Sequence, residues 1–135
     1  MKSLFPDICS RNLVKSKEFY VSLLGFEVIF EINWYIQLQS PSVEPIQIAF
    51  VEINHPSVPK GHQKTPQGVV VTVEVDDVDV VYQKALELNL PVVVDLCDEE
   101  WGQRHFMVED PNGLLVDIYT MIEPTPEFAE QHGLA

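Results

Sequence analysis

The chain contains few cysteines and few basic residues, and each shortage excludes a class of protein. Its two cysteines, Cys9 and Cys97, are too few for a disulfide framework and lack the spacing of a metal-binding motif. Eight lysines and arginines stand against 21 aspartates and glutamates, which gives a net charge of −13. Such a field repels phosphate backbones and anionic lipids, so we expect no nucleic-acid partner and no membrane partner. The same charge favours either simple solubility or a site for a cationic ligand, and both interpretations stay open.

The sequence also lacks an apolar run of membrane-spanning length, and residues 1–7 contain no signal-peptide core. We therefore expect a cytoplasmic protein. Its 135 residues, 46% of them hydrophobic, are enough to form the core of one domain and exclude a disordered chain.

The first half has the pattern of a strand, a helix and three further strands. We expect the opening strand at residues 4–10, a helix at 13–24, a strand at 26–32, and a hairpin with strands at 34–38 and 46–50. Asn12 is placed as the helix N-cap and Gly25 as the glycine that follows its last turn. Residues 53–68 hold three prolines and two glycines without periodicity, which is typical of a linker.

The second half repeats this order of elements. We expect a strand at residues 69–75, a helix at 78–88 capped by Asp76 and Asp77, a strand at 91–96 and a loop at 97–100. A hairpin follows from residue 101 to 119, with its turn at Asp-Pro-Asn-Gly, residues 110–113. Residues 126–131 are expected to add one or two helical turns.

The repeated order predicts an α+β fold made of two β-α-β-β-β modules within one domain, residues 1–135. Module one spans residues 3–52, the linker 53–68, module two 69–120, and a C-terminal tail 121–135. The repeat lies in the order of elements, since sequence identity between the halves is low.

Two sequence blocks resemble the vicinal oxygen chelate superfamily, which includes glyoxalase I, extradiol dioxygenases and the fosfomycin and bleomycin resistance proteins. One block is Asn-Leu-Val-Lys-Ser-Lys-Glu-Phe-Tyr at 12–20 followed by Leu-Gly-Phe at 24–26. The other comprises Val-Asp-Asp-Val-Asp at 75–79, Trp-Gly-Gln-Arg at 101–104 and Asp-Pro-Asn-Gly at 110–113. The resemblance implies a curled mixed sheet around a cleft between the modules, helices on the outside, and a homodimer.

Metal-dependent members of that superfamily carry His, Gln or Glu ligands on the opening and closing strands of both modules. Carried over one residue at a time, the resemblance puts these positions on Phe5, Ala49, Val70 and Asp117. Only Asp117 can coordinate a cation, and a divalent metal needs about three or four protein donors. We therefore expect no metal at these positions and no other cofactor. A register shift of two residues, which brings in Asp7 or Gln47, leaves a divalent metal open as the minor alternative.

Strand alternation indicates which side chains face the cleft, because successive side chains point to opposite faces. The uniformly apolar positions 69, 71, 73 and 75, together with 106, 108, 114, 116 and 118, are expected to face the helix of module two. The opposite face then provides the ligand-binding candidates. They are Asp7, Tyr35, Gln47, Thr72, Glu74, Trp101, Gln103, His105, Met107, Asp117 and Tyr119.

His105, Glu74 and Asp117 are also the candidate catalytic residues. His105 either binds a ligand or exchanges protons with Asp117 or Glu74 as partner, or else it only hydrogen-bonds a neighbouring strand. Cys9 and Cys97 have no activating cationic neighbours in sequence, so a nucleophilic role is not expected.

These features predict a small-molecule-binding protein of the bleomycin-resistance type. It would sequester an organic and possibly cationic ligand in the cleft between the modules, without a metal. The alternative function is a glyoxalase-like lyase or isomerase, or a dioxygenase, with a relocated metal or acid–base site built from His105, Asp117, Glu74 and Gln47.

Overall fold

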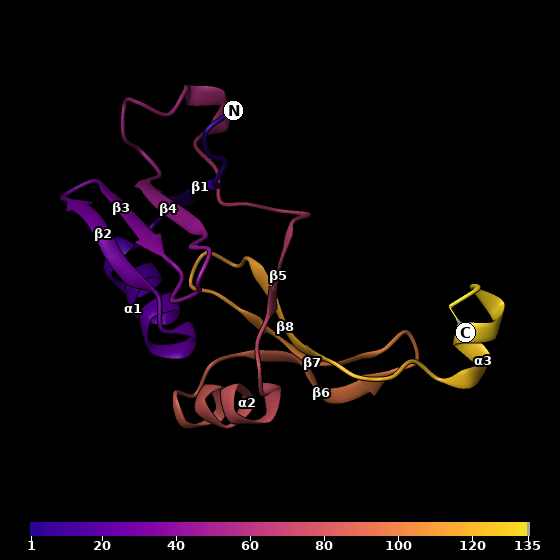
Figure 1. The fold of residues 1–135 in the computed structure, drawn as a ribbon. Coiled ribbons are helices and arrows are strands. Elements are labelled where there is room, and N and C mark those ends of the chain that lie inside the picture. The colour runs from indigo at the N-terminus through magenta and orange to yellow at the C-terminus, as the bar shows by residue number, and fades with distance from the viewer. Residues whose placement is uncertain (135) are drawn as a thin grey trace. The chain divides into compact units, whose positions relative to one another are not determined.

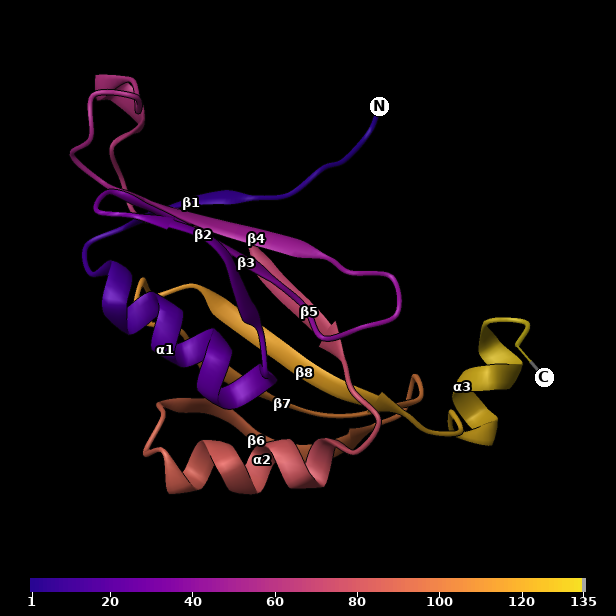
Figure 2. The same cartoon turned by 60° about the vertical axis from the view of Figure 1, so that its left-hand side comes forward.

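The computed structural model describes residues 1–134, and the chain divides into two compact units. Unit 1 comprises residues 1–69 together with the short segment Asp110–Leu114, and unit 2 comprises residues 70–109 and the chain from Leu115 onward. Figures 1 and 2 show the ribbon in two views. Among the described residues, no helix has both the length and the apolar character needed to cross a membrane.

Unit 1 contains one helix on a four-stranded mixed sheet. Its elements are β1 (Asp7–Ser10), α1 (Leu13–Leu24), β2 (Glu27–Ile32), β3 (Tyr35–Gln39), β4 (Gln47–Glu52) and a 3-10 turn, η1 (Lys60–His62). The strand order is β1-β4-β3-β2, with β1 parallel to β4 and the other pairs antiparallel. Helix α1 packs on β3 and β4 (Figure 1). Its residues Phe19, Tyr20 and Leu23 are buried.

The caps of α1 agree with the sequence prediction. The Asn12 side chain accepts a hydrogen bond from the Lys15 backbone N–H at 3.0 Å, and this satisfies one of the free donors at the helix start. Gly25 adopts φ +73°, in the left-handed region that a glycine tolerates after the last turn. The predicted bounds, residues 13–24, are confirmed because both ends carry a specific local signal.

Unit 2 has the same topology. Its elements are β5 (Val70–Glu74), α2 (Val78–Glu87), β6 (Val92–Glu99), β7 (Gln103–Glu109), β8 (Leu115–Met121) and α3 (Pro126–Gln131). The strand order is β5-β8-β7-β6, with β5 parallel to β8. Helix α2 packs on β6, β7 and β8 (Figure 2). Tyr82 of α2 meets Phe106 of β7 edge-on. The predicted α+β fold with two β-α-β-β-β modules is confirmed.

The turn Asp110-Pro111-Asn112-Gly113 belongs to unit 1 and is held by buried hydrogen bonds. Asp110 Oδ1 accepts from the backbone N–H groups of Asn112 at 2.8 Å and Leu114 at 2.9 Å. Its Oδ2 accepts from the Tyr20 hydroxyl at 2.8 Å, and Asn112 Nδ2 donates to Ser16 Oγ at 3.1 Å. Burial, with the nearby charge of Asp110, raises the pKa of Tyr20 far above its ordinary value. The sequence block at 12–20 and this turn are therefore partners in one polar network.

Most predicted strand ends differ from the structure by one or two residues, and two were wrong by three. Strand β1 begins at Asp7 instead of residue 4, since Pro6 has no N–H to donate and Leu4 is 81% exposed. The loop predicted at 97–100 is mostly strand, because β6 continues to Glu99 and pairs there with β7. Acidic residues have low strand propensity, but the cross-strand pairing decides the outcome. The second correction matters for the site, since it places Cys97 and Glu99 on the sheet.

Candidate functional site

The face of the unit 2 sheet opposite α2 holds most of the predicted site residues. The strand register aligns Thr72 of β5, Asp117 of β8 and Met107 of β7 in one row across the sheet. A second row contains Glu74, Tyr119, His105 and Cys97, in that order from β5 to β6. The register thus places residues from four strands side by side on this face, which we call the acidic face.

His105 is the centre of the acidic face. It is only 3% exposed, and both of its ring nitrogens lie beside carboxylates. Nδ1 is 2.7 Å from Asp117 Oδ1, and Nε2 is 3.2 Å from Glu99 Oε1. Burial lowers the pKa of His105, but hydrogen bonds to Asp117 and Glu99 and the charge of both outweigh it, so the pKa is raised. The same hydrogen bond lowers the pKa of Glu99.

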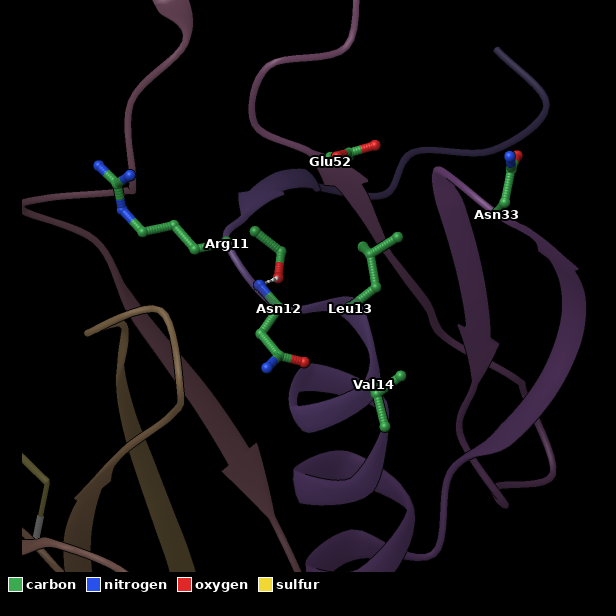
Figure 3. Close-up of a pocket in the computed structure, with 7 residues that line it drawn as sticks. Arg11, Asn12, Leu13, Val14, Asn33 and Glu52 are labelled. Atoms are coloured by element: carbon green, nitrogen blue, oxygen red, sulfur yellow. Dashed lines mark hydrogen bonds between the residues drawn. The ribbon is translucent and has the colours of Figure 1, made fainter.

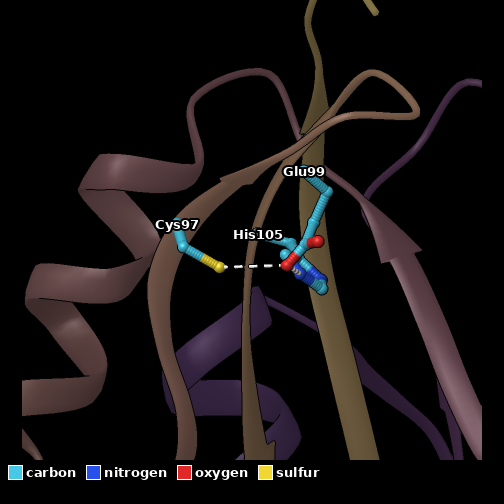
Figure 4. Close-up of side chains that lie close together, drawn as sticks. All are labelled: Cys97, Glu99 and His105. Atoms are coloured by element: carbon cyan, nitrogen blue, oxygen red, sulfur yellow. Dashed lines mark hydrogen bonds and ion pairs between the residues drawn. The ribbon is translucent and has the colours of Figure 1, made fainter. Parts of the chain in front are cut away.

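Glu99 also joins Cys97 to this group. The Cys97 thiol donates to Glu99 Oε1 at 3.2 Å, and Figure 4 shows Cys97 and Glu99 of β6 directed toward the His105 ring of β7. The hydrogen bond to Glu99 raises the pKa of Cys97, with burial and the charges of Glu99 and Asp98 adding to it. The thiol therefore stays protonated near neutral pH, which opposes a nucleophilic role.

Aromatic side chains border the acidic face. Trp101, in the turn between β6 and β7, is 45% exposed and stands edge-on to His105 with ring centroids 6.2 Å apart. Its Nε1–H donates to Gln103 Oε1 at 2.8 Å. The Tyr119 hydroxyl lies 3.5 Å from Glu74 Oε2, and burial, then the charge of Glu74, raises the pKa of Tyr119.

The candidates of unit 1 lie at three different positions of the β1-β4-β3 register. The Tyr35 hydroxyl donates to Gln37 Oε1 at 2.9 Å, and Gln37 donates in turn to Gln47. Asp7 is opposite Ala49 in the β1–β4 register. Burial raises the pKa of Asp7, and burial followed by the charge of Asp7 raises the pKa of Tyr35. Gln37, which links Tyr35 to Gln47 through its hydrogen bonds, faces the same side as Tyr35 by alternation.

A shallow depression lies elsewhere in unit 1, at the start of α1 (Figure 3). Residues 10–14, Asn33 and Glu52 line it. Within it the Asn12 backbone N–H donates to Ser10 Oγ at 3.1 Å. Of these side chains, Ser10 and Asn12 accept hydrogen bonds at the helix start, and no ion pair is formed among the lining residues.

Cys97 and Glu99 were missed by the sequence analysis, although both touch His105 or its partners. Residues 95–99 show no simple alternation, because the β6–β7 register shifts between Val94 and Cys97. Beyond that irregularity Cys97 is opposite His105, and Glu99 is opposite Gln103. The acidic Asp-Glu-Glu run at 98–100, directly before a predicted strand, was the available signal.

The positions where the superfamily usually holds its metal do not fit one in this chain. Phe5 precedes β1, Ala49 is fully buried and has no donor atom, and Val70 begins β5 opposite Leu115. At the remaining position, Asp117 Oδ1 is engaged in a hydrogen bond with His105 Nδ1 at 2.7 Å. One carboxylate with three hydrocarbon side chains cannot satisfy a divalent cation, so no chemistry is assigned to a metal there.

Two four-stranded sheets of order β1-β4-β3-β2 and β5-β8-β7-β6, each with a helix packed on it, define the class of fold. A family model described as the Glyoxalase/Bleomycin resistance protein/Dioxygenase superfamily matches residues 5–118. The chain belongs to this superfamily, as the two sequence blocks predicted. No curated protein matches it at a level that would indicate a closer relative.

Solved structures of the same fold cover nearly the whole chain. TioX from Micromonospora sp. ML1 shares 19% identity with a TM-score of 0.71, over 90% of this chain and 100% of that one. TnmS3, an antibiotic binding protein from Streptomyces sp. CB03234, shares 21% identity with a TM-score of 0.68, over 90% and 96%. A superfamily enzyme from Burkholderia phytofirmans PsJN shares 15% identity with a TM-score of 0.73, over 87% and 97%. At these identities the similarity establishes the fold alone.

Proposed function

We propose that this protein binds a small organic cation on the acidic face of unit 2 and holds it without converting it. The observation that carries the proposal is a group of three carboxylates on a single face: Asp117 and Glu99 contact the His105 imidazole, and Glu74 lies beyond Tyr119 in the same row. Even with His105 protonated, the formal charge of this group is negative. The proposed binding uses no metal, since three of the superfamily's four usual ligand positions carry the hydrocarbon side chains of Phe5, Ala49 and Val70.

The electrostatics of the chain support a cationic ligand. A net charge of −13 creates a field that draws cations toward the protein and raises their rate of encounter. Glu74 is exposed and accessible to a ligand, whereas Asp117 is 8% exposed and acts mainly through His105. Glu74 is therefore the carboxylate expected to meet the ligand's charge directly.

Aromatic rings beside these carboxylates support an aromatic ligand. Trp101 offers an exposed indole, and Tyr119 lies next to Glu74. Such rings stack on planar organic molecules and attract cations to their faces. TnmS3, which is described as an antibiotic binding protein, uses the same fold for a binding function.

We further propose that the protein works in the cytoplasm as a homodimer. Both cysteines are free thiols, which suits a reducing compartment. Every residue of the edge strand β2 is exposed, including Val28, Ile29 and Phe30, so the strand offers an apolar surface that a second copy would cover.

The proposal is tested with a planar aromatic cation, ethidium, titrated into EDTA-treated protein and followed by its fluorescence. We expect saturable binding that EDTA does not change, and much weaker binding of the anionic probe anilinonaphthalene sulfonate. Glu74→Gln should weaken ethidium binding by about 5-fold, as expected for one partly exposed charge.

The matched control is Glu87→Gln, which removes an equal charge from an exposed position on α2. It should leave the affinity close to that of the wild type. Equal weakening by both variants would mean that only the overall charge attracts the dye. Absence of saturable binding would contradict the proposal outright.

One observation favours a second candidate function, a lyase or isomerase that moves a proton. The 2.7 Å contact of His105 Nδ1 with Asp117 is the arrangement of a histidine base with its orienting carboxylate. The test is the hemithioacetal of methylglyoxal and glutathione, incubated with the protein in D2O. If the wild type incorporates deuterium into the product and His105→Ala does not, the protein is a proton-transferring enzyme and the sequestration proposal is wrong.

A further inference from the structure

Three different metal-donor groups come together at the end of the β6–β7 hairpin. They are a thiol, a carboxylate and an imidazole, from Cys97, Glu99 and His105, and their donor atoms all lie within 4.8 Å of one another (Figure 4). Glu99 Oε1 is 3.2 Å from Cys97 Sγ and 3.2 Å from His105 Nε2. All three residues lie on strands, so the backbone already places them together.

These separations match those of ligands around a tetrahedral ion. Zinc binds sulfur at about 2.3 Å and nitrogen or oxygen at about 2.0–2.1 Å, so neighbouring ligands in a tetrahedron are about 3.3–3.8 Å apart. The two contacts of Glu99 Oε1 are 3.2 Å long and all three donor atoms lie within 4.8 Å of one another, so these separations bracket that range. Small side-chain rotations would therefore seat an ion among the three atoms in place of the present hydrogen bonds.

The orientation of His105 is an independent sign of a metal site. Its Nδ1 lies 2.7 Å from Asp117 Oδ1, and the ring is 3% exposed, so Asp117 fixes the ring with Nε2 directed at Cys97 and Glu99. Metal-binding histidines commonly donate the other ring N–H to a carboxylate in this way, which sets the tautomer and strengthens the ligand. Asp117 is then a positioning residue outside the ligand set.

We propose that Cys97 Sγ, Glu99 Oε1 and His105 Nε2 bind a zinc-type divalent cation, with Asp117 holding His105 in place. Binding displaces the thiol proton and any proton on Nε2 to solvent, and a fourth coordination position stays open to water. Thiolate together with imidazole and carboxylate favours zinc over magnesium or calcium. These three ligands are not at the superfamily's usual metal positions. The metal site is additional to the binding of an organic cation proposed above, which the metal-free protein carries out.

The test uses Co²⁺ added to the full chain after EDTA treatment and reduction, since cobalt reports its ligands spectroscopically. We expect visible bands of tetrahedral intensity and a near-ultraviolet thiolate-to-cobalt band, both abolished by one equivalent of Zn²⁺. Cys97→Ser should remove the thiolate band, and Glu99→Gln should weaken binding. Asp117→Asn should keep the band and lower the affinity about 10- to 100-fold.

Cys9→Ser is the matched control, because Cys9 is half-buried in unit 1 and its thiol contacts the His62 carbonyl at 3.6 Å. It should leave the cobalt spectrum unchanged. Retention of the thiolate band in Cys97→Ser, or only weak octahedral absorption in the wild type, would overturn the proposal. Ethidium binding by the metal-free variants is measured in parallel, so failure of the metal site is distinguishable from failure of the ligand site.

Discussion

Replacing Asp117 with asparagine should destabilise the metal-free protein in a pH-dependent manner. The variant keeps the size and shape of the side chain and removes its charge. Asp117 is 8% exposed, and its Oδ1 faces the buried His105 Nδ1 at 2.7 Å. A hydrogen bond to a charged group contributes about 1.5–3 kcal/mol, whereas one between neutral groups contributes about 0.5–1.5 kcal/mol.

The sign follows from the raised pKa of His105. A histidine whose pKa is higher in the folded state stabilises the protein fully below its unfolded pKa, about 6.5, and this contribution is lost as pH rises through the folded value. At pH 6 the imidazolium meets a carboxylate in the wild type and only an amide in Asp117→Asn. At pH 9 the neutral ring can donate Nδ1–H to either side chain.

We therefore expect Asp117→Asn to lower the free energy of unfolding by about 1.5–3 kcal/mol at pH 6. At pH 9 the loss should be below about 1 kcal/mol. Urea denaturation in EDTA at the two pH values measures both. Glu123→Gln, an exposed carboxylate in the tail, is the control and should change stability little at either pH. An equal loss at pH 6 and pH 9, or a greater loss at pH 9, would refute the reasoning.

Two further substitutions test the folding of each unit separately, one in unit 1 and one in unit 2. Tyr20→Phe should lower the free energy of unfolding by about 1–3 kcal/mol, because buried Asp110 Oδ2 loses its hydroxyl donor at 2.8 Å. The control Tyr82→Phe removes an exposed hydroxyl and should change the free energy of unfolding little in the same urea assay. Gly102→Ala should lower the free energy of unfolding by about 1–3 kcal/mol, measured by thermal unfolding. Residue 102 has φ +100°, and a Cβ there would lie 2.9 Å from the Ile122 carbonyl oxygen. A neutral Gly102→Ala would mean that the β6–β7 turn relaxes without strain.

Much of the fold could be predicted because local signals mark the ends of elements. The helix at 13–24 begins at an Asn cap and ends at a left-handed glycine, and the tail helix at 126–131 begins with Pro126 after a Thr125 cap. The turn at 110–113 was predicted from its Asp-Pro-Asn-Gly composition, but its hydrogen bonds to α1 were not. Those depend on residues about 90 positions apart, which no local pattern specifies.

The site was predictable only where strands alternate regularly. Alternation along β7 and β8 placed His105 and Asp117 on one face, and the register puts them within hydrogen-bonding distance. Cys97 and Glu99 were not predicted as site residues, because the pairing of β6 with β7 changes register after Val94. An irregularity of this kind arises from pairing with the neighbouring strand, so the sequence of β6 alone does not indicate it.

The most direct test of the central claim maps the binding face residue by residue. In ¹⁵N-labelled, EDTA-treated protein titrated with ethidium, amide shifts should concentrate at Thr72, Glu74, His105, Asp117 and Tyr119, which lie across β5, β8 and β7. Shifts confined to unit 1, or scattered over the surface without saturation, would contradict a ligand site on the acidic face.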